Sequence, residues 1–216
     1  MKRLFALLVF ALGGTFAASA ASAQSDTARR YAACLTQLRP NEVRDLLHAT
    51  DANAANMPYH ALSNDDRCFG QVFGDKQFRP EDASFSIDTL RGTLAEQELR
   101  PEADQVAALQ PLPLQQKRYI RPWFTATGRN PAVDEMGACM ADTDPAGIMG
   151  LIRTSPGTTD ESSAISVMST ALTKCLSAGT RLDASRGALR AALADALYQR
   201  LSNPSLSLAQ AAQPSK

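Results

Sequence analysis

Apolar residues recur at helical spacing from Tyr31 onward. Tyr31, Cys34, Leu35 and Leu38 occupy positions i, i+3, i+4 and i+7, the stripe of an amphipathic helix that we expect to begin at about residue 26. Pro40 ends this helix and can begin the next, because the missing N–H of proline costs nothing in a first helical turn. The pattern therefore predicts a helical hairpin.

The second helix of this hairpin buries Val43, Leu46 and Leu47. Residues 49–58 have no apolar stripe and several asparagines and aspartates, so they are expected to form a loop. A short third helix is predicted over 59–68. A fourth helix is predicted to begin at Asp88, whose carboxylate can accept hydrogen bonds from the free N–H groups.

The second half of the chain repeats this arrangement. Cys34 precedes Pro40 by six residues, and Cys139 precedes Pro145 by six residues. An apolar pair follows each proline at the same distance. Such a repeat indicates one helical unit present twice, with helices in the second copy starting at Asp160 and Asp183. The helix from Asp160 is expected to end at Gly179, and leucines at 189, 193, 197 and 201 give the last helix its buried stripe.

The repeat also selects the disulfide pairing. Each copy contains two cysteines, separated by 34 residues in the first and 36 in the second. Cys34 is therefore predicted to pair with Cys68, and Cys139 with Cys175. In the chain-entropy model, closing a loop of this length stabilises the fold by about 3.8 kcal/mol.

Two Arg-Gly pairs occupy matching places in the two copies, Arg91-Gly92 and Arg186-Gly187. Glycine inside a helix costs about 1 kcal/mol relative to alanine. Its presence indicates that another backbone crosses closely, and the hairpin helix is the expected neighbour. The arginines are expected to have a structural role, reaching an acidic side chain or loop carbonyls, with anion binding as the alternative.

Between Phe69 and Ser86 the first copy contains an insertion of 12 residues, because Cys68 precedes Ile87 by 19 residues and Cys175 precedes Leu182 by seven, and this stretch contains four phenylalanines. Insertions confined to one repeat are often sites of specialisation. The alternative is that these phenylalanines close an otherwise open core.

A proline-rich linker over 101–133 is expected to be mostly extended or turned. It contains the run Lys117-Arg118-Tyr119-Ile120-Arg121-Pro122-Trp123-Phe124. One interpretation is a contact surface between the copies formed by Tyr119, Arg121 and Trp123, with Arg over an aromatic ring. The other is that the aromatic rings pack the linker onto the helices while the basic groups stay in water.

The ends of the chain are expected to lie outside the fold. Lys2 and Arg3, the apolar run after them and Ala21-Ser22-Ala23 have the features of a signal peptide over residues 1–23. Repeat 1 then spans 24–100, repeat 2 spans 134–202, and 203–216 is predicted to be a disordered tail. No segment after the signal peptide is apolar enough to cross a membrane.

The net charge of the chain and the compartment that its cysteines indicate limit the classes of partner that we expect. Removal of Lys2 and Arg3 leaves 20 basic against 22 acidic residues, without the basic footprint of a nucleic-acid binder. Export and paired cysteines indicate a periplasmic or secreted protein. The expected partner is an envelope protein or a small ligand.

Catalytic and metal-binding motifs are missing from the sequence. His48 and His60 are the two histidines, and their spacing matches no standard ligand motif. A metal-dependent or hydrolytic enzyme centred on them is one alternative, and a carrier of an apolar ligand between the repeats is another. No metal or other cofactor is expected.

Three short motifs resemble a group of small exported bacterial proteins with a duplicated two-cysteine helical repeat. They are the run from Cys139 to Pro145, Arg-Pro-Trp-Phe at 121–124 and Leu-Arg-Gly-Thr-Leu at 90–94. The resemblance implies export and an internal repeat, and it carries no activity. We therefore expect an all-α protein of two similar helical repeats, each with one disulfide, that acts as a non-enzymatic binding or structural protein of the bacterial envelope.

Overall fold

The structure is a computed structural model that describes residues 16–74, 85–115, 118–176 and 184–211. Within these ranges the chain forms α-helices and one 3-10 turn, and no β-strand, so the predicted all-α class is confirmed. The first half contains α1 (Phe16–Leu38), α2 (Pro40–His48), α3 (Ala52–Ser63), α4 (Asp66–Phe73) and α5 (Ile87–Leu99). After these come α6 (Ala103–Ala108), η2 (Pro122–Ala126), α7 (Pro131–Thr143), α8 (Pro145–Arg153), α9 (Thr159–Cys175), α10 (Arg186–Ser202) and α11 (Pro204–Ala211).

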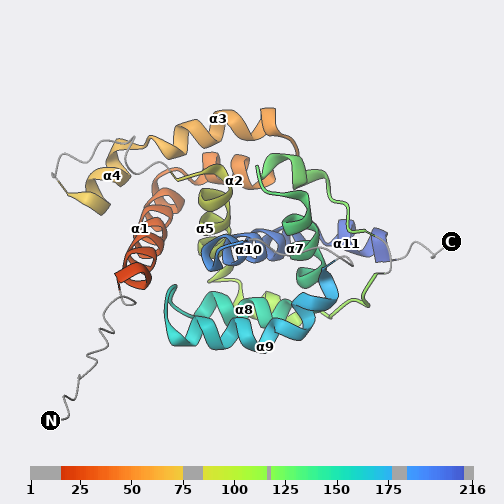
Figure 1. Ribbon diagram of the computed structural model, residues 1–216. Helices are drawn as coiled ribbons and strands as arrows, with labels where there is room; N and C mark the ends of the chain where they lie inside the picture. The colour runs from red at the N-terminus through yellow and green to blue at the C-terminus, as the bar shows by residue number, and fades with distance from the viewer. Residues whose placement is uncertain (1–15, 75–84, 116–117, 177–183, 212–216) are drawn as a thin grey trace, which may run out of the picture.

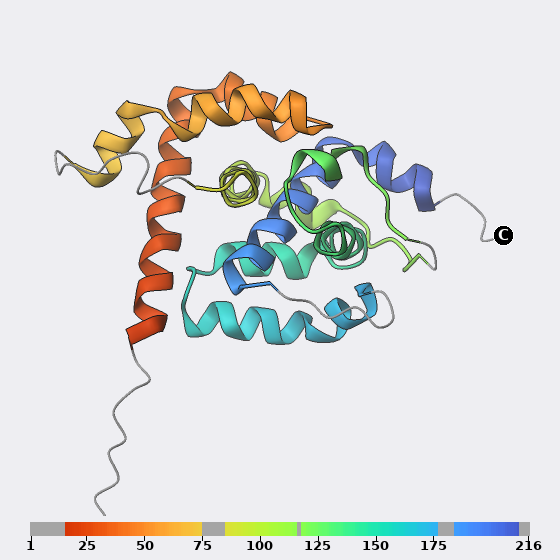
Figure 2. The same ribbon diagram turned by 45° about the horizontal axis from the view of Figure 1, so that its top comes forward.

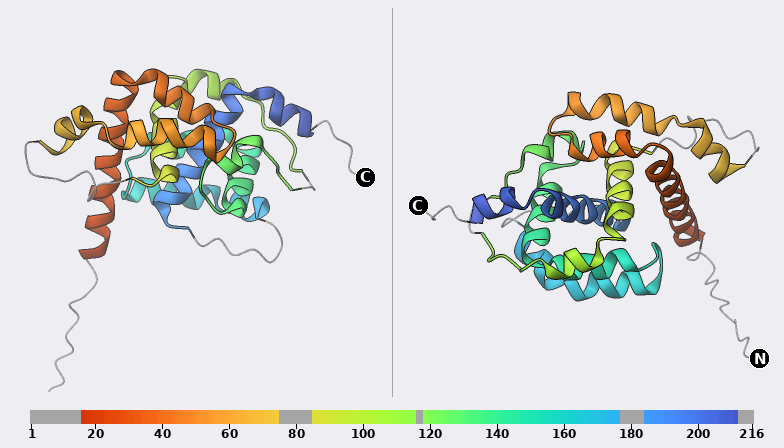
Figure 3. Two further views of the ribbon diagram at one scale, coloured as in Figure 1. Left: turned by 90° about the horizontal axis from the view of Figure 1, so that it is seen from above. Right: turned by 180° about the vertical axis from the view of Figure 1, so that it is seen from behind.

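Helix α10 lies at the centre of the molecule, with α5 and α7 packed directly against it (Figure 1). Helices α2 and α3 cover one side of this centre, and α8 and α9 cover the opposite side (Figures 2 and 3). Helix α1 stands beside α5. Buried apolar residues from both halves belong to one continuous cluster, so the two expected copies share a single core.

Both hairpin predictions are confirmed at the prolines. Helix α2 begins at Pro40 and α8 begins at Pro145, and a single residue separates each from the end of the preceding helix. Val43, Leu46 and Leu47 are buried as expected. A helix of nine residues therefore begins at each proline, which is compatible with the predicted repeat.

The prediction of a loop over residues 49–58 is wrong, because α3 begins at Ala52. The side chain of Asp51 accepts hydrogen bonds from the N–H groups of Asn53 and Ala54 and caps the helix. The short helix predicted over 59–68 is also wrong in its bounds. Helix α3 ends at Ser63, and Cys68 belongs to α4, which Asp65 caps.

Several other boundaries need correction. Asp88 and Asp160 lie inside the first turns of α5 and α9, and the caps of α9 and α10 are Thr158 and Ser185. Helix α9 ends at Cys175, while the predicted cap Asp183 lies outside the described residues.

The terminal and linking segments are more helical than expected. The predicted linker contains α6 and η2, and α7 already begins at Pro131. Residues 204–211 of the predicted disordered tail form α11, which packs on α10 and buries Ser207. Helix α1 begins at Phe16, inside the predicted signal peptide, and residues 1–15 lie outside the described ranges, so signal cleavage stays a prediction.

Both predicted disulfides are present. Cys34–Cys68 joins α1 to α4 with a Cα–Cα distance of 5.6 Å, and Cys139–Cys175 joins α7 to the end of α9 at 5.5 Å. Each bridge therefore lies within one half of the chain.

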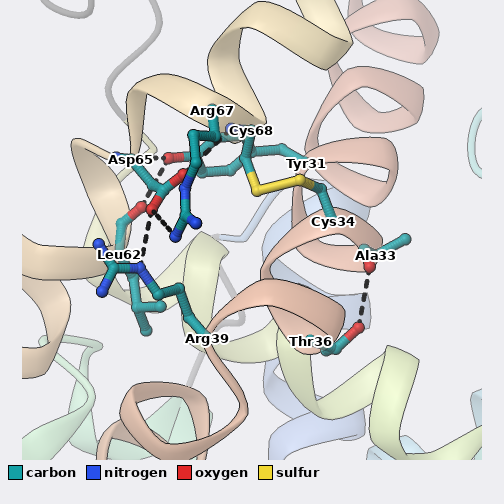
Figure 4. Close-up of a disulfide and its surroundings, with 9 residues drawn as sticks. All are labelled: Tyr31, Ala33, Cys34, Thr36, Arg39, Leu62, Asp65, Arg67 and Cys68. Atoms are coloured by element: carbon teal, nitrogen blue, oxygen red, sulfur yellow. Dashed lines mark hydrogen bonds and ion pairs between the residues drawn. A yellow bond between two sulfur atoms is a disulfide. The ribbon is translucent and has the colours of Figure 1, made fainter.

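A hydrogen-bond network surrounds the first bridge (Figure 4). Tyr31 donates its hydroxyl proton to the carbonyl oxygen of Leu62 at 2.6 Å and accepts the N–H of Asp65 at 3.2 Å. The carboxylate of Asp65 accepts from the N–H of Cys68 and from Arg39 Nε. The same residues that cap α4 thus fix it against α1.

The described phenylalanines of the insertion close the core around Tyr31. The rings of Phe69 and Phe85 are buried, with centroids 4.7 and 5.4 Å from that of Tyr31. Phe73 stacks on Phe69 at 5.6 Å, and Phe78 lies outside the described residues. These contacts favour the packing interpretation of the insertion.

The close backbone approach predicted at Gly92 is confirmed, but the neighbour is α10 and not the hairpin helix. A Cβ atom placed on Gly92 would lie 2.3 Å from Ala191 Cβ and 2.4 Å from its Cα. At Gly187 the nearest atom to such a Cβ is Ser185 Oγ, at 3.9 Å. The close approach expected at Gly187 is therefore wrong, and the tight crossing of α5 over α10 depends on Gly92.

Replacing Gly92 with alanine should separate α5 from α10. We expect Gly92→Ala to lower the free energy of unfolding by about 1–3 kcal/mol or more, as overpacking of a core does. Gly187→Ala is the matched control and should raise that free energy by about 0.5–1 kcal/mol through helix propensity. Urea unfolding of both variants measures the difference, and equal stabilities would contradict the tight crossing.

Candidate functional site

The crossing of α5 and α10 contains a fully buried ion pair. Arg91 Nε donates to Asp195 Oδ2 at 2.8 Å, and both side chains are 0% exposed. The two Nη atoms of Arg91 donate to the carbonyl oxygens of Leu46 and Leu47 at 2.5 and 2.7 Å. These carbonyls belong to the last turn of α2, where the helix itself supplies no partners. Arg91 thus reaches an acidic side chain, one of the two predicted partners, while the carbonyls it binds belong to a helix end and not to a loop.

A second ion pair repeats this arrangement in the opposite direction. Arg190 on α10 donates through Nε and Nη2 to the two carboxylate oxygens of Glu96 on α5, at 2.7 and 2.8 Å. Its Nη2 also donates to the carbonyl oxygen of Ile152, at the end of α8. Each central helix therefore contains an arginine that donates to an acid on the other central helix and to a backbone carbonyl at the end of a hairpin helix.

One offset of 99 residues relates the members of these two ion pairs, Arg91 with Arg190 and Glu96 with Asp195. The same offset relates Gly92 to Ala191, the two residues at the point of closest approach. These reciprocal contacts between α5 and α10 are compatible with the predicted repeat.

The register predicted for the last helix of the repeat is thus wrong by four residues. Leu189-Arg190 matches Leu90-Arg91, and the cap Ser185 matches Ser86. Arg186 is the first residue of α10, and it donates from the surface to Ser162 Oγ at 2.8 Å. Arg186-Gly187 therefore does not have the buried structural role of Arg91-Gly92.

The buried carboxylates are ionised partners of arginine. Burial acts to raise the pKa of Asp195, but the charges and hydrogen bonds of Arg91 and Arg129 outweigh it and lower that pKa. For Glu96 burial is likewise outweighed, here by Arg190 and Arg100, and the pKa is lowered. A general acid or base needs a pKa near the working pH. Both groups are therefore suited to holding helices together and not to proton transfer.

The predicted contact surface formed by Tyr119, Arg121 and Trp123 is turned inward. Their exposed fractions are 5, 6 and 3%. Arg121 Nη2 donates to Asp142 Oδ2 on α7 at 2.8 Å, and its guanidinium lies 5.6 Å from the centre of the Tyr119 ring. The prediction of an accessible surface here is wrong, because these side chains attach the linker to α7.

A small cavity lies beside this attachment, between η2, α7, α10 and α11. Its volume is about 10 Å³, room for about one water molecule, so an apolar ligand does not fit. Arg121, Trp123, Asp142, Gln199, Arg200 and Ser207 are among the residues around it. Burial raises the pKa of Asp142 against the opposing effects of Ser207, Arg121 and Arg200.

The two histidines have separate surroundings. His48 Nε2 lies 3.2 Å from the Tyr198 hydroxyl at the surface, and His60 is exposed beside the ring of Tyr59. Across the described ranges no three His, Cys, Asp or Glu side chains are grouped to hold a metal ion. In the same ranges no helix has the length and apolar character needed to cross a membrane.

Sequence reasoning missed the acids and arginines that complete the central network. Arg129 donates to both Asp134 and Asp195, at 3.1 and 2.9 Å, and it is buried between them. The second Leu-Arg-x-x-Leu run, at 189–193, was the signal that could have identified Arg190. No comparable signal marks Glu96 or Asp195, since single acids recur throughout the helices.

Comparisons with known proteins give no relative for this chain. No protein-family model, no curated protein and no solved structure matches it.

The inward position of Trp123 leads to a direct test. We expect Trp123→Ala to lower the free energy of unfolding by about 3–5 kcal/mol, as removal of a buried tryptophan does. Ile120→Ala is the control, because Ile120 is 76% exposed and its loss should change stability by about 0.5 kcal/mol at most. Chemical denaturation decides, and a Trp123→Ala protein as stable as the control would restore the surface interpretation.

Proposed function

We propose that the protein is an exported, non-enzymatic binding or structural protein of the bacterial envelope. The observation that carries this proposal is the crossed pair of ion pairs, Arg91–Asp195 and Arg190–Glu96. These buried charges bind one another and the ends of α2 and α8. Charged groups used in this way hold the helices together, which supports a structural or binding role.

The disulfides support the choice of compartment. Cys34–Cys68 and Cys139–Cys175 account for all four cysteines of the sequence. Disulfides persist in the periplasm and outside the cell and are rare in the cytosol. Together with the signal-like residues 1–23, they favour a site of action in the periplasm or beyond the cell.

Export can be tested by the mass of the protein recovered from a bacterial host. We expect the full-length gene to yield a chain in the periplasm or the medium that begins at Gln24 and contains two disulfides. Changing Ala21 and Ala23 to bulky residues should block cleavage, because the processing site needs small side chains. A cytosolic product that retains residues 1–23, or one with free thiols, would contradict the proposal.

The enzymatic alternative has its own measurement. The purified protein should contain no stoichiometric metal, and changing His48 and His60 to alanine should leave its metal content and stability unchanged. Elemental analysis and denaturation curves provide both values. One bound metal per chain that is lost in the double variant would favour the enzyme.

A further inference from the structure

Glu96 on α5 has more arginine side chains around it than its counterpart on α10, Asp195. Arg190 and Arg100 donate to the carboxylate of Glu96, and Arg29 Nε on α1 lies 3.4 Å from Glu96 Oε1. Glu161 on α9 is the second acid, 3.2 Å from Arg190 Nη1. We call these five residues the Glu96 cluster. It contains three positive and two negative side chains.

The matching group around Asp195 in the other half contains equal numbers of positive and negative side chains. Around Asp195 the ion pairs join Arg91 and Arg129 with Asp195 and Asp134, two charges of each sign. Asp134 on α7 follows Arg29 on α1 by 105 residues, the same offset that separates Cys139 from Cys34. At the position where one half has an aspartate, the other half therefore has an arginine, and this exchange creates the surplus charge.

Glu96 does not accept a hydrogen bond from Arg29 Nε. Its Oε1 atom already accepts hydrogen bonds from Arg100 Nη2 at 2.7 Å and Arg190 Nη2 at 2.8 Å, and a carboxylate oxygen has about two lone pairs to offer. Arg29 Nε is buried and, among the described residues, has no hydrogen-bond partner. Burial and the charges of Arg100 and Arg190 lower the pKa of Arg29, against the opposing charges of Glu96 and Asp26. Glu96 therefore acts on Arg29 as a charge at 3.4 Å and leaves the hydrogen bond of Arg29 Nε unmade.

The unmatched charge faces a place that a small ligand can reach. The side chains of Arg29 and Arg100 are 21 and 32% exposed, whereas Arg190 and Glu96 beneath them are 5 and 3% exposed. The place lies where α1 stands beside the end of α5 and the turn from α8 to α9 (Figures 2 and 3). The guanidinium of Arg29 on α1 and that of Arg100, the residue after α5, meet there at Glu96 Oε1, and two planar guanidinium groups brought together in this way favour an oxyanion.

We propose that Arg29 and Arg100 bind one phosphate group at the mouth of the Glu96 cluster. The phosphate is inorganic phosphate or the phosphate of a larger envelope molecule, because the two arginines would recognise the same oxygens in either. The assignment gives a ligand class to this surface; binding of the free ion does not depend on export of the chain, whereas binding of an envelope molecule rests on the proposed function.

The test measures how phosphate changes the melting temperature of the purified, oxidised protein at constant ionic strength. At about ten times its dissociation constant, phosphate should raise the Tm by roughly 3–5 °C, as expected for a ligand that binds only the folded state. Arg29→Gln and Arg100→Gln should each abolish this shift. Both side chains are partly exposed, so a folding defect in one variant leaves the other to give the result.

Arg30→Gln is the matched control. It removes the same charge from the neighbouring position of α1, where Arg30 is 56% exposed and pairs with Asp26 instead of Glu96. It should keep the full phosphate response. No shift in the wild type, or an equal shift in Arg29→Gln, would overturn the site, and loss of the shift in Arg30→Gln would reduce it to a general charge effect.

Lipid vesicles separate the two sources of phosphate. Phosphatidylglycerol vesicles that sediment the wild type, and release it when inorganic phosphate is added, would support a phosphate carried by an envelope lipid. A response to inorganic phosphate alone supports the free ion. Sedimentation with vesicles that phosphate does not reverse, without any Tm shift, would contradict the site.

Discussion

The rest of the structure depends on the exchange of arginines between α5 and α10. The side chains of Arg91 and Arg190 each extend from one central helix to an acid on the other. Each also donates to a backbone carbonyl oxygen at the end of a hairpin helix. A charge taken out of water must be paired and hydrogen-bonded, or it destabilises the fold by several kcal/mol. The two halves therefore satisfy one another's buried charges in this placement of α5 and α10.

The disulfides act at the periphery of this centre. One joins α1 to α4 and the other joins α7 to α9, so each fixes outer helices within its own half. The contact between the halves contains no covalent link among the described residues. It is made by the Gly92–Ala191 approach and by the charged network, which together position α1, α2, α7 and α8 around the central helices.

The features predicted correctly were those with a local chemical signature. Repeated cysteine spacing gave both disulfides, and Pro40 and Pro145 gave the hairpins. An arginine beside a helical glycine indicated a buried, structural role at Arg91.

Features set by contacts between distant segments could not be predicted. Helix α3 has no apolar stripe, and its signal was only the cap at Asp51. The Tyr119 to Trp123 segment looked polar enough for a surface, but Asp142, 21 residues after Arg121, draws the arginine inward. The Arg-Gly pair at 186 matched the wrong residues, because Leu-Arg-x-x-Leu is the run that faces the other helix.

A double-mutant cycle on Arg91 and Asp195 tests the central claim most directly. Asp195→Leu leaves the buried Arg91 without its acid, and Arg91→Leu leaves Asp195 with Arg129 as its remaining arginine, so each change should lower the free energy of unfolding, by about 3–5 kcal/mol for Asp195→Leu. If the pair joins the halves as described, the double variant should lose less than the sum of the two, by about 2–3 kcal/mol. Losses that add to within about 0.5 kcal/mol would show that the two side chains act independently, which would contradict the account.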